Sequence, residues 1–378
     1  MADAVIAGAG EAPYSRHPSR GTTTESLLSH AAQRALRNAG LEPSAVDGLA
    51  VASFSLAPDH AIDLAWKLGL RLRWLMEDTN GGASGINMLQ HAVRAVEAGD
   101  ADAVLVLAGD HLTRDDFAAL VAAYNAATRD YLAPLRFGGP NALFAFLTQR
   151  HMARHGLVRE DYGELVLAQR EWAARNPGAV YREPLTMADY LAAPMVAEPL
   201  SRYDCAPVVT GADALVVAAS GTRRPVAVRA LRASYNWDQQ EGDGLRTGLA
   251  LSREALWEET GAGPDDVDVA SVYDDYPVMV LVQLEDLGFF GEGEAKRFVA
   301  QTIAPRRLPL NTSGGQLSAG QAGAAGGLHG LVEAVRQLRG EARERQVAGA
   351  RRALVTGYGG VLYRYGACAN AAVLERLR

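Results

Sequence analysis

Hydrophobic residues follow two different periods along this chain. The stretches "TESLLSHAAQRALRNAG" (24–40) and "INMLQHAVRAVEAG" (86–99) place apolar residues at the spacing of an amphipathic helix. The short runs "VDGLAVAS" (46–53) and "ADAVLVLAG" (101–109) are almost continuously apolar, which is typical of buried strands. This alternation predicts an α/β protein in which helices cover a largely buried sheet.

The same order of segments occurs twice. Residues 40–53, "GLEPSAVDGLAVAS", are echoed by residues 261–275, "GAGPDDVDVASVYDD", and residues 80–109 are echoed by residues 311–360. The matching positions of the first pair are Pro43, Val46 and Asp47 with Pro264, Val267 and Asp268. We therefore predict two duplicated α/β halves, residues 1–222 and 223–378. An insertion at about 114–203 in the first half is expected to cover a shared site as a lid.

Each half has a glycine-rich turn that opens a helix, at Asn80–Gly85 and at Asn311–Gly327. The first amide groups of a helix have no partner within it, and the helix dipole is positive there. Such a helix start favours an anion or a developing oxyanion. Because the halves are related, we expect the two turns to face one another.

Charge and composition exclude several classes of function. The formal net charge is −7 and no Lys/Arg cluster is interleaved with aromatic residues, so nucleic acid is not an expected partner. No apolar run is long enough to span a bilayer. The chain begins with an acidic residue, Asp3, where a signal peptide carries basic ones. These features predict a cytoplasmic protein without a membrane partner.

Metal and dinucleotide sites are also not predicted. His151 and His155 stand four residues apart, but no third ligand is near them in the sequence, and they are interpreted as two exposed helix histidines. The glycines of "AGAGEAP" (7–13) resemble a dinucleotide fingerprint. Pro13 follows where a helix should begin, which argues against it.

Five blocks of the sequence resemble the thiolase superfamily, most closely its branch related to sterol carrier protein X. The blocks are "NGGASG" (80–85), "YDCAPVVTGADALVVAAS" (203–220), "VYDDYPVMVLVQLEDLGFFGEGE" (272–294), "NTSGGQLSAGQAGAAGG" (311–327) and "GYGG" (357–360). The resemblance implies a thiolase fold with five αβαβα layers, a homodimer and acyl-CoA substrates. Coenzyme A would then enter as part of the substrate, and no other cofactor is expected.

The chain departs from the thiolase pattern at its catalytic positions. Gly82 stands where a thiolase has its nucleophilic cysteine, Gln321 where it has a histidine, and Gly357 where it has a second cysteine. Cys205 and Cys368 fall elsewhere and are not expected to be nucleophiles. The resemblance implies that backbone amides near Gly82 and Gly359 still cradle a thioester oxygen. Asn311, at the tight turn, is a further candidate for substrate binding, although a structural role in the turn fits it better.

Thiolase-like aldolases lack the cysteine and use tyrosines for proton transfer. The resemblance places one of these tyrosines at Tyr273, and the other would fall near Gln321, which cannot carry a proton. Tyr358 or Tyr276 is the substitute that the sequence offers. Of the adjacent acids Asp274 and Asp275, only one can face the site, and Asp274 is taken as the catalytic candidate.

Three functions remain open at this point. The first is a lyase that performs retro-aldol cleavage on an acyl-CoA, and the second is a thiolase-type acyltransferase acting with a partner subunit. The third is a non-catalytic, thiolase-shaped scaffold for lipid or CoA. The resemblance also implies a partner protein that combines a zinc ribbon with an OB-fold.

Overall fold

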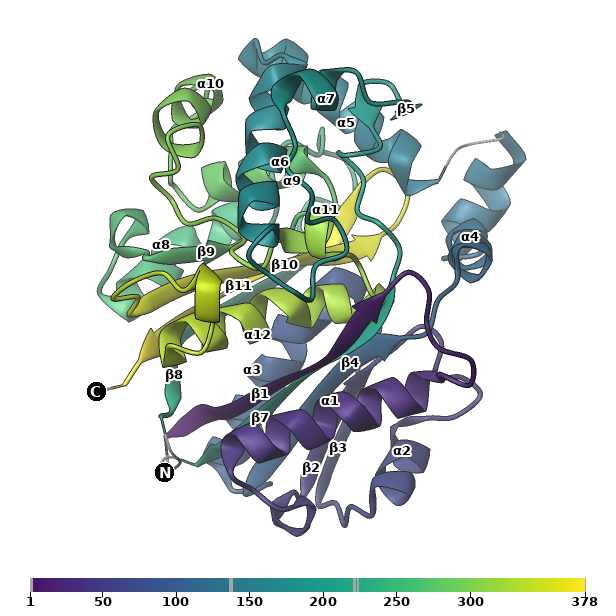
Figure 1. Cartoon of the computed structure of the whole chain (residues 1–378), viewed down its shortest axis with the longest axis vertical. Coiled ribbons are helices and arrows are strands. Elements are labelled where there is room, and N and C mark those ends of the chain that lie inside the picture. Colours follow the sequence, from purple (N-terminus) through teal and green to yellow (C-terminus); the bar gives the residue numbers. More distant parts are fainter. Residues whose placement is uncertain (1–2, 136–138, 220–221, 223, 378) are drawn as a thin grey trace.

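The computed structural model describes residues 3–135, 139–219, 222 and 224–377 (Figure 1). Helices and strands alternate as the hydrophobic pattern predicts. The elements before the insertion are β1 (Ala4–Ser15), α1 (Thr24–Ala39), η1 (Pro43–Ala45), β2 (Gly48–Ala52), α2 (Ala61–Leu68), β3 (Trp74–Glu77), η2 (Gly81–Ala83), α3 (Ser84–Ala98) and β4 (Ala103–Asp110). The insertion holds α4 (Arg114–Ala122), η3 (Thr128–Leu132), η4 (Ala133–Leu135), α5 (Pro140–His155), α6 (Arg159–Ala173), α7 (Met187–Leu191), β5 (Met195–Ala197) and β6 (Leu200–Ser201).

The chain then returns to the sheet through β7 (Thr210–Ala219) and enters the second half. Its elements are β8 (Val226–Tyr235), α8 (Leu249–Thr260), η5 (Pro264–Asp266), β9 (Val269–Ser271), α9 (Pro277–Asp286), α10 (Ala295–Phe298), η6 (Val299–Ile303), α11 (Gly315–Ala319), η7 (Gly323–Ala325), α12 (Gly326–Arg339), η8 (Arg343–Arg345), β10 (Arg352–Val361) and β11 (Gly366–Arg376). The predicted boundary at residues 222 and 223 includes residue 223, which lies outside the described residues. This division therefore stays a prediction.

The strand order repeats in the two halves. The large sheet runs β3-β2-β4-β7-β1-β8-β11-β10-β9, and a bridge from Leu310 to Ala270 extends it beside β9. In the first half, the order from the outer edge inward is β3, β2, β4, β7 and β1. In the second half, the equivalent order is the segment at Leu310, β9, β10, β11 and β8. The halves join where β1 pairs with β8, at Val5 with Ala227 and Ile6 with Val226.

Two aspartates show how closely the halves correspond. Asp47 accepts hydrogen bonds from the amides of Asp102 and Ala103 at 2.8 and 3.0 Å, just before β4. In the second half, Asp268 accepts from the two amides at the start of β10, those of Arg351 and Arg352, at 2.8 and 2.9 Å. Both aspartates thus fix the register of a central strand.

Five layers result from the way the helices bury their apolar faces. One hydrophobic cluster joins α1 and α2 to the strands of the first half. A second joins α8, α9 and the insertion's α5 and α6 to the second half, and a third joins α3 and α12 to strands of both halves. Figure 1 shows α3 and α12 side by side in the middle. The predicted αβαβα fold is confirmed.

Burial of the helices agrees with their layer. α1 has a single apolar stripe and begins at Thr23, whose side chain accepts from the amide of Ser26. The first six residues of α3, by contrast, are all buried, because the helix is covered on both sides. No helix within the described ranges is both long and apolar enough to cross a membrane.

Candidate active site

The two glycine-rich turns meet where α3 and α12 cross. A Cβ atom on Gly85 would overlap the carbonyl group of Gly327, and one on Gly327 would lie 2.8 Å from the carbonyl oxygen of Gly82. Real side chains do not come so close to a backbone, so the crossing requires glycine on both helices. The prediction that the turns face one another is confirmed.

The two turns differ in what faces their amides. In the second turn, the amide of Ala324 donates to the carboxylate of Asp110 at 2.7 Å, at the end of β4. The strand register described above makes Gly359 of β10 the counterpart of Asp110, and Gly82 is the counterpart of Ala324. A Cβ on Gly359 would lie 2.8 Å from the amide nitrogen of Gly82. Within the described part of the chain, no side chain accepts a hydrogen bond from that amide.

The ring of Tyr273 fills the space beside Gly82. A Cβ built on Gly82 would overlap the phenol carbons and the hydroxyl oxygen of Tyr273. Tyr273 lies two residues after the end of β9 and is 7% exposed. A cysteine side chain at residue 82 would overlap the Tyr273 ring in this rotamer. The absence of the cysteine and the position of the tyrosine ring therefore depend on each other.

Tyr273 is held by hydrogen bonds at both ends. Its amide donates to Thr356 Oγ1 at 2.9 Å, and its carbonyl accepts from Gln283 Nε2 at 2.8 Å. Its hydroxyl oxygen accepts from Gln321 Nε2 at 3.0 Å. Since Gln321 donates this bond, the phenol keeps its own proton for another acceptor. Burial, with the charge of Asp275 next in size, raises the tyrosine's pKa well above its usual value.

The two adjacent acids have different surroundings. Asp274 accepts from the amides of Gln316 and Leu317, at 2.9 and 3.3 Å, and so caps the start of α11. Burial raises its pKa to about 7. Burial and the charge of Asp274 raise the pKa of Asp275 well above the usual range. Asp275, and not Asp274, is the larger electrostatic influence on Tyr273.

Asp275 also influences the two other candidate tyrosines. After burial, its charge is the largest cause of the raised pKa of both Tyr276 and Tyr358. The hydroxyl of Tyr276 donates to Asn141 Oδ1 at 2.7 Å, and its ring stacks on Phe144 of α5 with centroids 4.3 Å apart. The Tyr358 hydroxyl accepts from the amide of Gly366 at 2.6 Å. Tyr276 thus anchors the insertion, while Tyr358 retains its proton.

Asn311 supports the segment that carries Tyr273. Its backbone adopts a positive φ of 48°. Its side chain accepts from the amide of Val272 at 2.7 Å and donates to the carbonyl of Val272 at 2.9 Å. These bonds give the Asn311 side chain a structural task immediately before Tyr273, and contact with substrate stays a prediction.

Both cysteines are held as thiols. Burial, with Asp204 and Asp275 adding, raises the pKa of Cys205 to about 12. Burial and Asp78 raise the pKa of Cys368 to about 11. The Cys368 sulfur lies 3.6 Å from Asn80 Oδ1, beside the first glycine turn, but a protonated thiol is a weak nucleophile.

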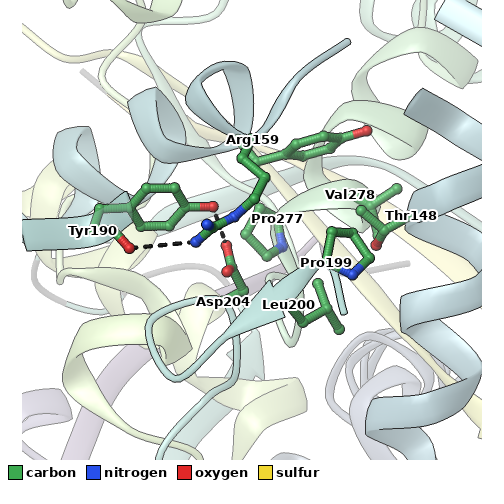
Figure 2. A pocket seen from close by; sticks show the side chains of 9 residues that line it. Thr148, Arg159, Tyr190, Pro199, Leu200, Asp204, Pro277 and Val278 are labelled. Carbon is green, nitrogen blue, oxygen red and sulfur yellow. Dashed lines mark hydrogen bonds between the residues drawn. The ribbon is translucent and has the colours of Figure 1, made fainter. Parts of the chain in front are cut away.

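A narrow crevice lies beneath the insertion, lined by Thr148, Arg159, Tyr162, Tyr190, Pro199, Leu200, Asp204, Pro277 and Val278 (Figure 2). The space between its atoms is about 210 Å³, yet it leaves no room for a water molecule. Tyr190 donates to Asp204 at 2.6 Å, and Arg159 reaches the Tyr190 carbonyl at 3.4 Å. These contacts fasten α6 and α7 to the segment before β7, so the crevice is packing and not a binding site.

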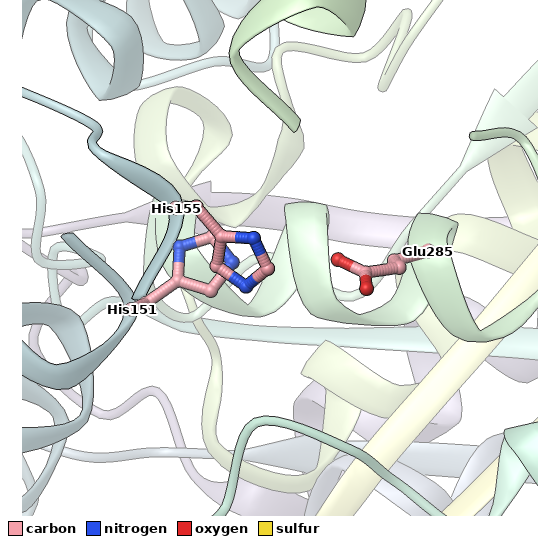
Figure 3. Close-up of side chains that lie close together, drawn as sticks. All are labelled: His151, His155 and Glu285. Atoms are coloured by element: carbon pink, nitrogen blue, oxygen red, sulfur yellow. The ribbon is translucent and has the colours of Figure 1, made fainter. Parts of the chain in front are cut away.

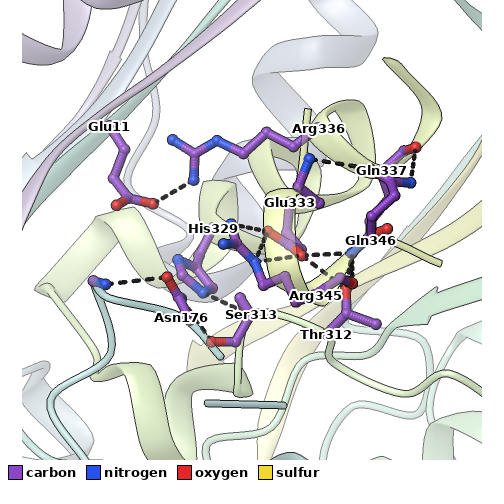
Figure 4. A network of polar contacts seen from close by, with 12 residues as sticks. Glu11, Asn176, Thr312, Ser313, His329, Glu333, Arg336, Gln337, Arg345 and Gln346 are labelled. Atoms are coloured by element: carbon purple, nitrogen blue, oxygen red, sulfur yellow. Dashed lines mark hydrogen bonds and ion pairs between the residues drawn. The ribbon is translucent and has the colours of Figure 1, made fainter. Parts of the chain in front are cut away.

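A buried polar network joins the two halves behind the glycine turns (Figure 4). Ser313 Oγ lies 2.7 Å from His329 Nε2, and His329 Nδ1 lies 3.7 Å from Asp213. These residue types could form a nucleophilic triad. Burial lowers the pKa of His329, but Asp213 and Glu11 outweigh that effect, so the pKa is raised. At 3.7 Å, Nδ1 makes no hydrogen bond to Asp213 that would orient the imidazole as in a triad, and the network is interpreted as structural.

Comparison with known proteins decides the family. Residues 233–374 match the family described as Thiolase C-terminal domain-like. A "17-hydroxy-3-oxo-4-pregnene-20-carboxyl-CoA lyase" from Mycobacterium tuberculosis is 34% identical over 387 residues, covering 95% of this chain and 97% of the relative. This chain belongs to the thiolase superfamily.

Within that superfamily, the aldolase branch gives further matches. A "Steroid side-chain-cleaving aldolase" from Thermomonospora curvata is 32% identical over 366 residues, 89% of this chain and 90% of the relative. The solved structure of an "Ltp2-ChsH2(DUF35) aldolase" superposes with a TM-score of 0.84 at 30% identity, covering 99% of this chain and 98% of that one. The predicted resemblance is confirmed.

Proposed function

We propose that this member of the thiolase superfamily is a lyase that cleaves a β-hydroxyacyl-CoA by retro-aldol chemistry, without an acyl-enzyme. The observation that carries the proposal is the ring of Tyr273 in the space beside Gly82. This arrangement removes the nucleophile and puts a proton donor in its place. The names of the two relatives above, a carboxyl-CoA lyase and a side-chain-cleaving aldolase, support it.

The reaction needs a base, an acid and a site for the oxyanion. A base takes the proton of the β-hydroxyl group, the bond between the α and β carbons breaks, and the β carbon becomes a carbonyl. The electron pair of that bond forms the thioester enolate, which is then protonated at the α carbon. We assign the amide of Gly82, facing Gly359, to the thioester oxygen.

Proton transfer is assigned to the residues around Tyr273. A buried phenol with a raised pKa stays protonated in the resting enzyme, so Tyr273 is the acid, and Gln321 orients its oxygen. We assign the base to Asp275, because its raised pKa gives its carboxylate a high affinity for the hydroxyl proton, and assign Asp274 to holding α11. Tyr358 is kept as a second candidate donor, because its hydroxyl accepts from the amide of Gly366 and has no other hydrogen bond to the described residues.

The test is to incubate the purified protein, alone and with its partner, with β-hydroxyacyl-CoA thioesters of different size. Mass spectrometry should find a shortened acyl-CoA and a matching carbonyl compound, while the intact mass of the protein stays unchanged. A protein that gains the mass of an acyl group would contradict the proposal and support the acyltransferase alternative. Failure to cleave any such thioester, with the partner present, would support the scaffold alternative.

We further propose a partner subunit of the zinc-ribbon and OB-fold type. Support comes from the solved aldolase structure, whose name joins Ltp2 to ChsH2(DUF35). Affinity purification of the tagged chain from its own cells, followed by size-exclusion chromatography, tests the pair. A single component of the size of this chain alone would contradict it.

We also propose a homodimer formed through β3. This strand ends the sheet, Leu75 on it is 41% exposed, and Ile62 and Trp66 of the neighbouring α2 are 59% and 79% exposed. An open strand edge beside exposed apolar side chains is a typical site for pairing with a second copy. Trp66→Asp is expected to shift the mass measured by light scattering from dimer to monomer. A cytoplasmic location is proposed with it and is tested by cell fractionation.

A further inference from the structure

Two histidines of α5 lie against a carboxylate of α9 (Figure 3). The interpretation of His151 and His155 as exposed helix residues is wrong for His151, which is 0% exposed. Glu285, distant in the sequence, brings a carboxylate oxygen to the pair. One ligand atom from each of the three side chains lies within 4.8 Å of the other two.

We propose that His151, His155 and Glu285 bind a divalent transition metal ion, with Zn²⁺ as the best fit. Buried polar atoms normally have partners. Here His151 Nε2 and His155 Nδ1 are both buried without a hydrogen-bond partner. Two imidazoles and one carboxylate are a donor set that zinc commonly takes. Ligands around zinc at about 2.1 Å are roughly 3.4 Å apart, so a small rotation of the side chains completes the site.

The histidines are in the form that binds metal. Burial lowers the pKa of His151 to about 3, and burial also lowers that of His155, so both imidazoles are neutral at pH 7. His151 Nδ1 lies 2.8 Å from the Tyr162 hydroxyl, which fixes the ring and leaves Nε2 as the ligand. The Glu11, Asp213 and His329 group also has ligand spacing, but the guanidinium of Arg336 lies 2.9 Å from Glu11. Arg336 therefore already supplies a cation there.

The ion would fasten the insertion to the core. α5 carries Asn141 and Phe144, which hold Tyr276, and α9 begins directly after Tyr276. A metal between the other ends of these two helices would fix the insertion at a second point. We therefore assign a structural role to the site, independent of the reaction.

The experiment uses the full chain stripped with EDTA and titrated with Zn²⁺, and with Co²⁺ as a spectroscopic probe. We expect about one ion per chain, a visible Co²⁺ absorption spectrum of four- or five-coordinate type, and a thermal midpoint raised by about 4 °C or more at saturating metal. His155→Ala and Glu285→Gln are expected to weaken binding at least about tenfold. The exposed His91→Ala serves as the matched control and should bind as the unaltered chain does.

Two results would overturn the site: less than about 0.2 ion per chain at saturation, or equal binding by the variants and the control. Because His151 also contacts Tyr162, its replacement is not used. Circular dichroism of the two variants without metal checks that each one folds.

Discussion

The two glycine turns occupy equivalent positions in the two halves, but their backbone amides have different partners. In the second turn, the carboxylate of Asp110 accepts from the amide of Ala324 and also from the amides of Phe54 and Ser55, at 2.7 and 2.8 Å. In the first turn, the equivalent strand position is Gly359, and no side chain within the described residues caps the amide of Gly82. One copy of the anion site is filled by the protein itself, while the other is the one we propose for the thioester oxygen.

The difference shows how a duplicated fold separates stability from chemistry. A helix start that receives a carboxylate from the neighbouring half gains a strong, buried set of hydrogen bonds. A helix start that faces glycine lacks that stabilisation, and in the proposed mechanism its amide binds a substrate oxygen. Substitutions in the first turn should therefore affect rate, and substitutions in the second should affect stability.

The largest effect is expected from Tyr273→Phe. Loss of the phenol proton should lower kcat about 10²- to 10⁴-fold, as is usual when a general acid is removed, with the free energy of unfolding little changed. Steady-state cleavage of a β-hydroxyacyl-CoA measures it. Tyr131→Phe, at a residue that is 69% exposed, is the control. An unchanged kcat would remove Tyr273 from the mechanism.

Asp110→Ala should give the opposite signature. It leaves several buried donors without an acceptor, so the free energy of unfolding should fall by about 3 kcal/mol. The rate of the remaining folded enzyme should change less than about threefold. Urea denaturation measures the stability, and the exposed Asp115→Ala is the control. A large loss of rate without loss of stability would contradict the assignment of stability to the second turn and of catalysis to the first.

Gly82→Ala tests the contact between the first turn and Tyr273. The new methyl group overlaps the phenol ring, so the ring must move away from Gln321. We expect a cost of about 1–3 kcal/mol in stability and a fall in rate of about tenfold or more. Gly263→Ala is matched to it, because the nearest atom to a Cβ there is 4.0 Å away. Equal behaviour of the two variants would mean that the ring does not depend on Gly82.

The smallest effect is expected from Gln321→Met. Methionine keeps the volume and removes the donor to the Tyr273 hydroxyl, a bond worth about 1 kcal/mol, so the rate should fall about fivefold. A pH–rate profile should accompany it. Gln321 donates to the phenol oxygen and so lowers the pKa of Tyr273, against the larger effect of burial. The variant should therefore shift the basic limb of the pH–rate profile to higher pH. If the limb does not shift, Gln321 serves packing alone.

The sequence predicted most of the fold because the pattern that signals it is repeated. The apolar segments that match between the halves form helices and strands, and paired residues such as Asp47 and Asp268 lie beside those strands. Local sequence patterns predict such positions well. The convergence of the glycine turns followed from the same duplication. The counterpart relation between Asp110 and Gly359 was present in the repeat as "VLAGD" against "VTGYG", but its meaning needed the strand register.

The side-chain partners could not be predicted in the same way. Asp274 and Asp275 are adjacent, and only the position of α11 shows that Asp274 is engaged by its amides. The burial of His151 and the approach of Glu285 depend on how α5 packs on α9, a contact between segments more than a hundred residues apart. Such contacts are set by tertiary packing, which no local pattern encodes.

The crossing of α3 and α12 also sets when the protein becomes competent during its synthesis. In the proposed site, the first glycine turn is made early in translation, and Tyr358 and Gly359 of β10 are made much later. A ribosome-bound chain is therefore expected to begin turnover only after β10 has emerged and docked. Truncated products of this gene should be inert toward thioesters however well their first half folds.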